Sequence, residues 1–312
     1  DLSDLIYGKG IKDMLDIEIF ENILSKIKPK TVLYRKEFNS FGRKITMSDP
    51  TNNIIKLAAQ HGIVNEHQLG YRHFNNEVST KISNQTDFKK YTPTPDILLT
   101  FGQRLRDHMI THAYPKEKII AIGSLRHDIF LKNVDKLSSC FIPNSMLVIA
   151  QWPQVLASWL EIIKNSYQTI NQKHKIYLRL HPNMKYDLEE YFNMFKNAEF
   201  YICDRDERLE KSLSRTEYVF THSSTVGLEA ILLDKKVVVL EQDGLESDNM
   251  LFNNDILFDR ISNKFDLADV IRKGGKKSNI PSYQNERKKY LKYHLNNIQG
   301  NAYEMLSTII EN

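Results

Sequence analysis

Hydroxyl, imidazole and guanidinium groups gather at the ends of two predicted strands in the second half of the sequence. The segment "KIYLRLHP" predicts a strand over 175–182 that ends with Arg179 and His181. The segment "EYVFTH" predicts a second strand over 217–222, and a helix is predicted to follow it. The junction of this strand and helix carries three successive hydroxyl side chains, Ser223, Ser224 and Thr225.

These residue types have two interpretations. Ser and Thr are favoured helix N-caps, so the three hydroxyl side chains could only close the start of a helix. A helix start with free N–H groups and hydroxyls also binds anions. Arg179 and His181 are two residues apart and therefore point to the same side of their strand, where they could clamp a phosphate. Glu229, five residues after Ser224, could reach a ribose hydroxyl or belong to a solvated helix face.

The first half contains a candidate general base in "AQHGIVNEHQLGYRHF", residues 59–74. We expect a helix that begins near residue 48 and ends at Gly62, so that His61 could face a binding site. His61 or Glu66 could then accept a proton from a substrate hydroxyl. The histidine spacing in this segment suits neither a helical metal pair nor a zinc finger, and we expect no metal.

Further charged candidates lie near the middle of the chain and in the first half. "GSLRHD" follows a predicted strand and offers Arg126 and Asp128, which could instead form a salt bridge at the strand end. Arg72 is a second cation that could bind a substrate carboxylate or phosphate. The sequence has no GxxxxGK[ST], no GxGxxG after a strand and no GxSxG, which argues against P-loop, dinucleotide and hydrolase-elbow sites.

The predicted elements that position these residues alternate between strands and helices, which is typical of parallel α/β structure. We expect an N-terminal domain over 1–140, a weakly periodic linker near 133–145, and a C-terminal domain over 141–312. A basic helical tail is expected from about 282, with the charged run "NERKKYLKYH". The other expected helices and strands are helices over 16–29, 103–114, 155–173, 187–195 and 208–216, and strands over 30–38, 96–102, 118–124, 146–151, 199–204 and 236–241.

The composition fits a folded chain of this type. The 312 residues are 41% hydrophobic and 26% charged, with a net charge of +4. This mild excess favours anionic partners but not nucleic acid. Two cysteines imply no disulfide framework, and no apolar run approaches the length of a transmembrane helix. We expect a cytoplasmic protein.

Four motifs in this order, "QHG", "GSLRHD", "RLHP" and "HSSTVGLEA", resemble bacterial surface-polysaccharide transferases of GT-B fold. One branch comprises CMP-Kdo- and CMP-sialic-acid-dependent glycosyltransferases, and a related branch comprises CDP-glycerol glycerophosphotransferases. The resemblance covers roughly residues 30–245. It implies an α/β fold with two Rossmann-like domains that face a central cleft.

The resemblance also implies roles for single residues. His181, Ser223 and Ser224 would hold the phosphate of a cytidine nucleotide, and Glu229 its ribose. His61 matches the proposed base of the glycerophosphotransferases. Asp128 matches the terminal Asp of their junction motif. Three departures from that branch, Leu125 in place of proline, "AQ" before His61 and His222 in place of an acidic residue, favour the CMP-sugar branch.

We therefore expect a metal-independent glycosyltransferase without a cofactor, which moves a Kdo-like or sialic-acid-like sugar from a CMP-activated donor to a glycan or glycolipid acceptor. In an inverting enzyme His61 or Glu66 would be the base. In a retaining enzyme Asp128 would be the nucleophile and Glu66 the acid/base. Arg126 or Arg72 would bind the sugar carboxylate.

Two alternatives stay open, a CDP-glycerol- or CDP-ribitol-dependent polyol-phosphate transferase and a non-catalytic nucleotide-binding assembly module. The basic tail could place the protein at the inner face of the bacterial inner membrane. We favour the alternative, a solvated helix that packs back on the fold, as at the C-terminus of many GT-B proteins.

Overall fold

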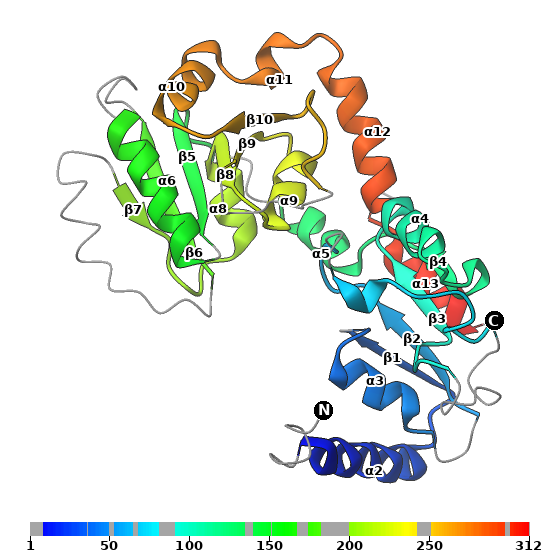
Figure 1. The fold of residues 1–312 in the computed structure, drawn as a ribbon. Helices are drawn as coiled ribbons and strands as arrows, with labels where there is room; N and C mark the ends of the chain where they lie inside the picture. The colour runs from blue at the N-terminus through cyan, green and yellow to red at the C-terminus, as the bar shows by residue number, and fades with distance from the viewer. Residues whose placement is uncertain are drawn as a thin grey trace. The chain divides into compact units, whose positions relative to one another are not determined.

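The chain forms two compact units, which are described one at a time (Figure 1). Unit 1 comprises residues 1–125 and 292–312, and unit 2 comprises residues 126–291. The computed structural model describes residues 9–35, 37–49, 53–64, 68–80, 91–134, 140–150, 152–166, 174–181, 200–241, 251–296 and 300–311.

Unit 1 is built on a four-stranded parallel sheet with the order β1-β2-β3-β4. Its strands are β1 (Thr31–Arg35), β2 (Ile55–Ala59), β3 (Ile97–Thr100) and β4 (Ile119–Ala121). The helices and short 3-10 turns of this unit are α2 (Lys9–Ile27), α3 (Ser40–Met47), η1 (Leu69–Tyr71), α4 (Gln103–Thr111), η3 (Lys116–Lys118) and α13 (Ala302–Glu311).

The two faces of this sheet carry separate hydrophobic clusters because neighbouring strand residues point to opposite sides. Ala58 and Leu98 pack in one cluster with Met109 of α4. Leu57 and Leu99 pack in the other cluster with Leu306, a residue of α13. Phe20 of α2 also packs against the first cluster, so helices from the first and the last residues described complete unit 1.

The expected helix over 48–62 is wrong, because β2 occupies this part of the chain. β2 pairs in parallel with β1 on one side and with β3 on the other. A central strand of a parallel sheet is buried on both faces and reads as a continuous apolar run without alternation. The short run "IKLAA" has no period that separates a buried strand from a helix. The correction places His61 just after a strand.

Unit 2 contains a six-stranded parallel sheet with the order β10-β9-β8-β5-β6-β7. Its strands are β5 (Ser145–Ala150), β6 (Lys175–Leu180), β7 (Phe200–Ile202), β8 (Tyr218–Thr221), β9 (Lys236–Leu240) and β10 (Phe258–Ile261). Its helices are α5 (Leu125–Val134), α6 (Pro153–Ser166), α8 (Leu209–Arg215), α9 (Val226–Leu232), α10 (Lys264–Lys273), α11 (Lys276–Asn279) and α12 (Tyr283–Leu295), where α5 and α12 connect to unit 1.

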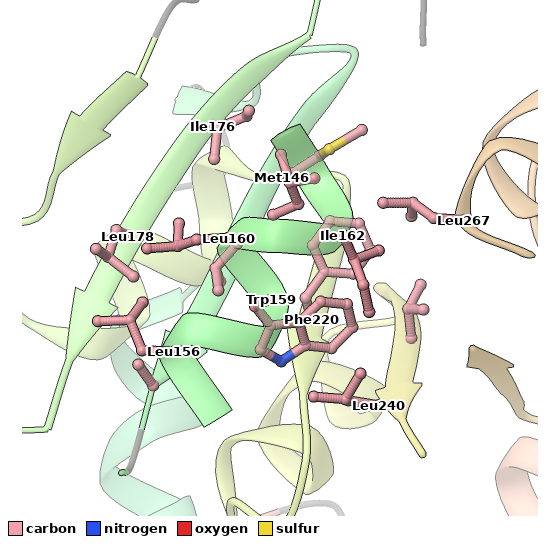
Figure 2. Packing of buried hydrophobic residues seen from close by; sticks show 14 of the residues in the cluster. Met146, Leu156, Trp159, Leu160, Ile162, Ile176, Leu178, Phe220, Leu240 and Leu267 are labelled. Carbon is pink, nitrogen blue, oxygen red and sulfur yellow. The ribbon is translucent and has the colours of Figure 1, made fainter. Parts of the chain in front are cut away.

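The core of unit 2 lies between α6 and the middle of the sheet (Figure 2). Trp159 of α6 stacks on Phe220 of β8, with ring centroids 5.1 Å apart. Both side chains are fully buried and are joined by Leu178 of β6 and Leu240 of β9. Burial of each such side chain contributes about 1.5–3 kcal/mol. This packing fixes the strands whose ends carry the candidate site.

The tail predicted from residue 282 is helical as expected, as α12 and α13. In the part of the chain that the structure describes, no helix combines the length and the apolar character needed to cross a bilayer. An expected helix near residues 187–195 falls outside the described residues.

Candidate functional site

The sheet of unit 2 has one topological switch point, between β5 and β8. From β5 the chain proceeds to β6 and β7 on one side, and then returns to β8, β9 and β10 on the other. Helical connections that leave a sheet in opposite directions open a crevice at the carboxyl ends of the two strands, where ligands of open α/β sheets bind. The structure thus defines a candidate binding position from topology alone.

Several of the predicted phosphate-binding residues follow strands at this edge. Ser223 and Ser224 follow β8 after one intervening residue, His222, and His181 comes directly after β6. The backbone N–H of His181 donates to the carbonyl oxygen of Ala150, 2.9 Å away, which brings the ends of β6 and β5 together. The His181 side chain is exposed and Ser223 is half-buried. The structure therefore gathers these residues around the end of β5.

The hydroxyls of Ser224 and Thr225 differ in whether they cap the helix α9. The Ser224 hydroxyl accepts a hydrogen bond from the Val226 N–H at 3.3 Å, so Ser224 closes the start of α9. Thr225 occupies the N-cap position without a side-chain cap hydrogen bond and is half-buried. The helix predicted over 225–234 is short, with seven residues in α9. The hydroxyls rather than a long helix dipole are the relevant groups.

Arg179 was expected to bind a phosphate together with His181, but its guanidinium forms hydrogen bonds within the protein instead. Its Nη1 donates to the Ser212 hydroxyl at 2.9 Å, and its Nη2 donates to the carbonyl oxygen of Glu207 at 2.7 Å. Ser212 lies in the middle of α8, and Glu207 lies in the segment before this helix. A phosphate contact by Arg179 would require it to share or exchange these bonds.

Glu229, the expected ribose ligand, is an internal carboxylate of unit 2. Its exposed fraction is 0%. Arg126 Nη2 lies 2.5 Å from Glu229 Oε1, and His127 Nε2 lies 3.4 Å from the same oxygen. Glu229 Oε2 has no hydrogen-bond partner among the described residues. Contact with a ribose would therefore require a rearrangement of Arg126, which was expected to bind a substrate carboxylate.

The remaining candidates are placed as follows. Asp128 lies in the first turn of α5 and is buried. Arg72 follows η1 in unit 1 and is exposed. Glu66 lies outside the described residues.

Trp152 is a residue of the switch point that the sequence reasoning missed. It lies two positions after the end of β5 and directly before α6, and half of it is exposed (50%). Its ring meets the buried ring of His222 edge-on at 6.3 Å between centroids. A half-exposed tryptophan at a strand end is a flat apolar surface against which a ring of a ligand could stack. The sequence feature that could have identified Trp152 is an aromatic residue shortly after a buried apolar run.

His61 of unit 1 follows β2, and its half-exposed ring faces a buried carboxylate. Its side chain is 48% exposed, and its Nδ1 lies 3.2 Å from Oε2 of Glu37. Glu37 is fully buried, and its Oε1 accepts a hydrogen bond of 2.6 Å from the Tyr71 hydroxyl. Burial, followed by the charge of Glu37 and this hydrogen bond, raises the pKa of Tyr71 well above its usual range. The phenol therefore stays protonated and donates.

The turn around His61 is fixed by its neighbour Gln60. The Gln60 side chain donates to the carbonyl oxygen of Gly62 at 2.7 Å and accepts from the Phe101 N–H at 2.8 Å. The backbone N–H of Gln60 donates to the carbonyl oxygen of Leu99 at 2.9 Å. These bonds tie both sides of His61 to the end of β3, which holds its backbone in one place.

The two parallel sheets define the fold class. The two parallel α/β units are Rossmann-like domains of the GT-B type, and solved structures share this fold. The wall teichoic acid polymerase TagF, as a histidine-to-alanine variant, is similar with a TM-score of 0.58 at 14% identity, over 90% of this chain and 72% of that chain. A histidine-to-asparagine variant of TagF soaked with CDPG gives a TM-score of 0.57, also at 14% identity, over 90% and 71%.

UDP-GlcNAc 2-epimerases share the fold as well. The enzyme from Neisseria meningitidis bound to UDP-GlcNAc is similar with a TM-score of 0.60 at 14% identity, over 96% of this chain and 81% of that chain. Neither protein-family models nor curated protein sequences match the sequence.

Proposed function

We propose that the protein is a transferase that moves a phosphorylated polyol from a CDP-glycerol-type donor to a hydroxyl acceptor. The observation that carries the proposal is the gathering of His181, Ser223 and Ser224 around the switch point of unit 2. The similarity in fold to TagF, of which one solved variant was soaked with CDPG, supports a donor of this type over CMP-Kdo or CMP-sialic acid.

The chemistry follows from the charge of the leaving group. When the bond to the nucleotide breaks, negative charge develops on the phosphate of CMP. His181 and the hydroxyls of Ser223 and Thr225 would stabilise this charge where it develops. His61 would accept the proton of the attacking hydroxyl.

A donor screen tests this proposal. Binding is measured by calorimetry for CMP, CDP-glycerol, CMP-sialic acid, CMP-Kdo and UDP-GlcNAc, and release of the nucleotide is measured for each donor. We expect CDP-glycerol to bind and to release CMP. Faster release from CMP-sialic acid or CMP-Kdo would instead favour the CMP-sugar glycosyltransferase, and binding without turnover would favour an assembly module.

Variants locate the binding position. We expect His181→Ala and Ser223→Ala each to weaken CMP binding by roughly 10- to 150-fold, as loss of a hydrogen bond to a charged group does. Ser158→Ala, which removes an exposed hydroxyl on α6, is the matched control and should leave the affinity unchanged. If both site variants bind CMP as the unmodified protein does, the phosphate site is not at the switch point.

A further inference from the structure

In unit 1, Tyr71 and His61 face the two carboxylate oxygens of Glu37. Glu37 carries no exposed surface, and a buried carboxylate needs partners that offset the loss of water. An ionised carboxylate only accepts hydrogen bonds, so each of its two oxygens requires a donor. Tyr71 supplies a donor to Oε1 at 2.6 Å, and the His61 ring faces Oε2 through Nδ1 at 3.2 Å.

This arrangement selects one tautomer of His61. With Oε2 of Glu37 as the acceptor, the proton of the neutral ring lies on Nδ1. The lone pair then lies on Nε2, which has no hydrogen-bond partner within the part of the chain that the structure describes. Because the side chain is 48% exposed, a ligand can approach the ring. The Gln60 bonds keep the backbone of His61 in place.

We propose that Glu37 and Tyr71 are positioning residues that hold His61 as a general base with Nε2 as the basic atom. The role of the base rests on the proposed function, whereas the selection of the tautomer does not. Tyr71 fixes the carboxylate of Glu37, and Glu37 orients the ring and stabilises the imidazolium that forms, which is the logic of a carboxylate–histidine pair.

The proton and electron pairs balance within one displacement. Nε2 of His61 takes the proton from the acceptor hydroxyl, and the oxygen uses the freed electron pair to bond to the phosphorus of the transferred group. The bond from that phosphorus to the oxygen bridging to CMP breaks, and CMP leaves with the electron pair. His61 is left as an imidazolium beside the Glu37 carboxylate and later loses its proton to solvent.

The first test reads the tautomer and needs no substrate. Nitrogen-15 NMR of the full-length protein, with the His61 signals assigned by their loss in His61→Asn, distinguishes a proton on Nδ1 from one on Nε2. We expect the Nδ1–H form in the unmodified protein and a shift toward a mixture in Glu37→Gln. Asp96→Asn, which alters another buried carboxylate of unit 1, is the matched control and should leave the His61 tautomer unchanged.

The second test measures CMP release from CDP-glycerol with glycerol as acceptor. We expect His61→Asn to lower kcat by roughly 10²- to 10⁴-fold, and Glu37→Gln to lower it by about tenfold or more with little change in KM. Tyr71→Phe should have a smaller effect in the same direction. In the His61→Asn background, Glu37→Gln should change kcat by less than about twofold, because its effect passes through His61.

The outcomes separate the two proposals. A His61 ring that carries its proton on Nε2 in the unmodified protein overturns the inference, as does an equal loss of kcat from Glu37→Gln with and without His61. Absence of CMP release from every donor of the screen overturns the proposed function and the role of His61 as a base with it, whatever the tautomer.

Discussion

The guanidinium of Arg126 lies 2.5 Å from the carboxylate of Glu229, a side chain of α9 without exposed surface. Removal of one partner of such a pair leaves a buried charge without compensation. We expect Arg126→Ala to lower the free energy of unfolding of unit 2 by about 1–2 kcal/mol, less than for a fully buried pair because half of the Arg126 side chain is exposed. Urea unfolding measures this change.

Two further variants separate the loss of the Arg126–Glu229 ion pair from general effects of replacing an arginine. Arg208→Ala removes a more exposed arginine, 3.3 Å from Glu210, and should cost less than about 1 kcal/mol. The double variant Arg126→Ala with Glu229→Gln should recover part of the loss. If Arg126→Ala is no more destabilising than Arg208→Ala, the pair does not stabilise the fold.

Trp152 reports on ligands at the switch point. The protein has two tryptophans, and Trp159 is fully buried in the core of unit 2. A ligand that binds beside β5 and β8 should therefore change the emission of the half-exposed Trp152 and leave that of Trp159 nearly constant. Titration with CMP should quench the red part of the emission spectrum. Trp152→Phe should abolish the response, and a response of full size in that variant would place the nucleotide elsewhere.

Gly102 leaves room for the end of α12. A Cβ at this position would lie 2.5 Å from the backbone oxygens of Tyr293 and His294. Backbone cannot yield as a flexible side chain does, so we expect Gly102→Ala to destabilise unit 1 by about 1–3 kcal/mol. Gly62→Ala, with no atom within 4 Å of its added Cβ, is the control and should change stability by less than about 0.5 kcal/mol. Thermal unfolding of both variants measures this difference. Similar midpoints for the two variants would contradict the prediction.

His294 makes stability depend on pH. Burial, and then the charge of Arg104, lower the pKa of His294 to about 4 from its usual 6.5. The unfolded chain binds a proton on His294 more tightly than the folded protein does. His294 therefore leaves the free energy of unfolding unchanged well above pH 6.5 and lowers it as the pH falls from 6.5 towards 4. Between pH 7 and pH 5 the loss amounts to about 2 kcal/mol.

The control for this dependence is His294→Asn. Burial also lowers the pKa of His73, so the unmodified protein should lose stability over the same range from both groups. Urea unfolding at pH 7 and pH 5 should show a smaller difference for His294→Asn than for the unmodified protein. Equal differences would mean that His294 does not titrate as its burial implies.

The sequence predicted those elements whose apolar runs are bounded by turn residues. The strands of unit 2 that carry His181 and Ser223 were predicted within one or two residues of their bounds, and topology then brought them together. β2 was mistaken for a helix because its burial on both faces removes the alternation that identifies a strand.

The partners of the candidate residues could not be read from the sequence. Glu37 is 24 residues from His61, and nothing in the spacing of the two predicts that a turn after β1 meets a turn after β2. Likewise, the sequence placed Arg179 beside His181, but the segment before α8 competes for its guanidinium. The cleft between the two halves and the peripheral membrane association stay predictions.

The packing of α13 on the first sheet has a consequence for biosynthesis. Leu306 closes the cluster that covers Leu57 and Leu99, so the first sheet lacks the packing on this face until α13 has left the ribosome. The sheet of unit 2 needs only the chain up to β10 to complete its strands. The unit synthesised first is thus completed last, and a nascent chain that stalls before residue 302 exposes an apolar sheet face to the chaperones of the cell.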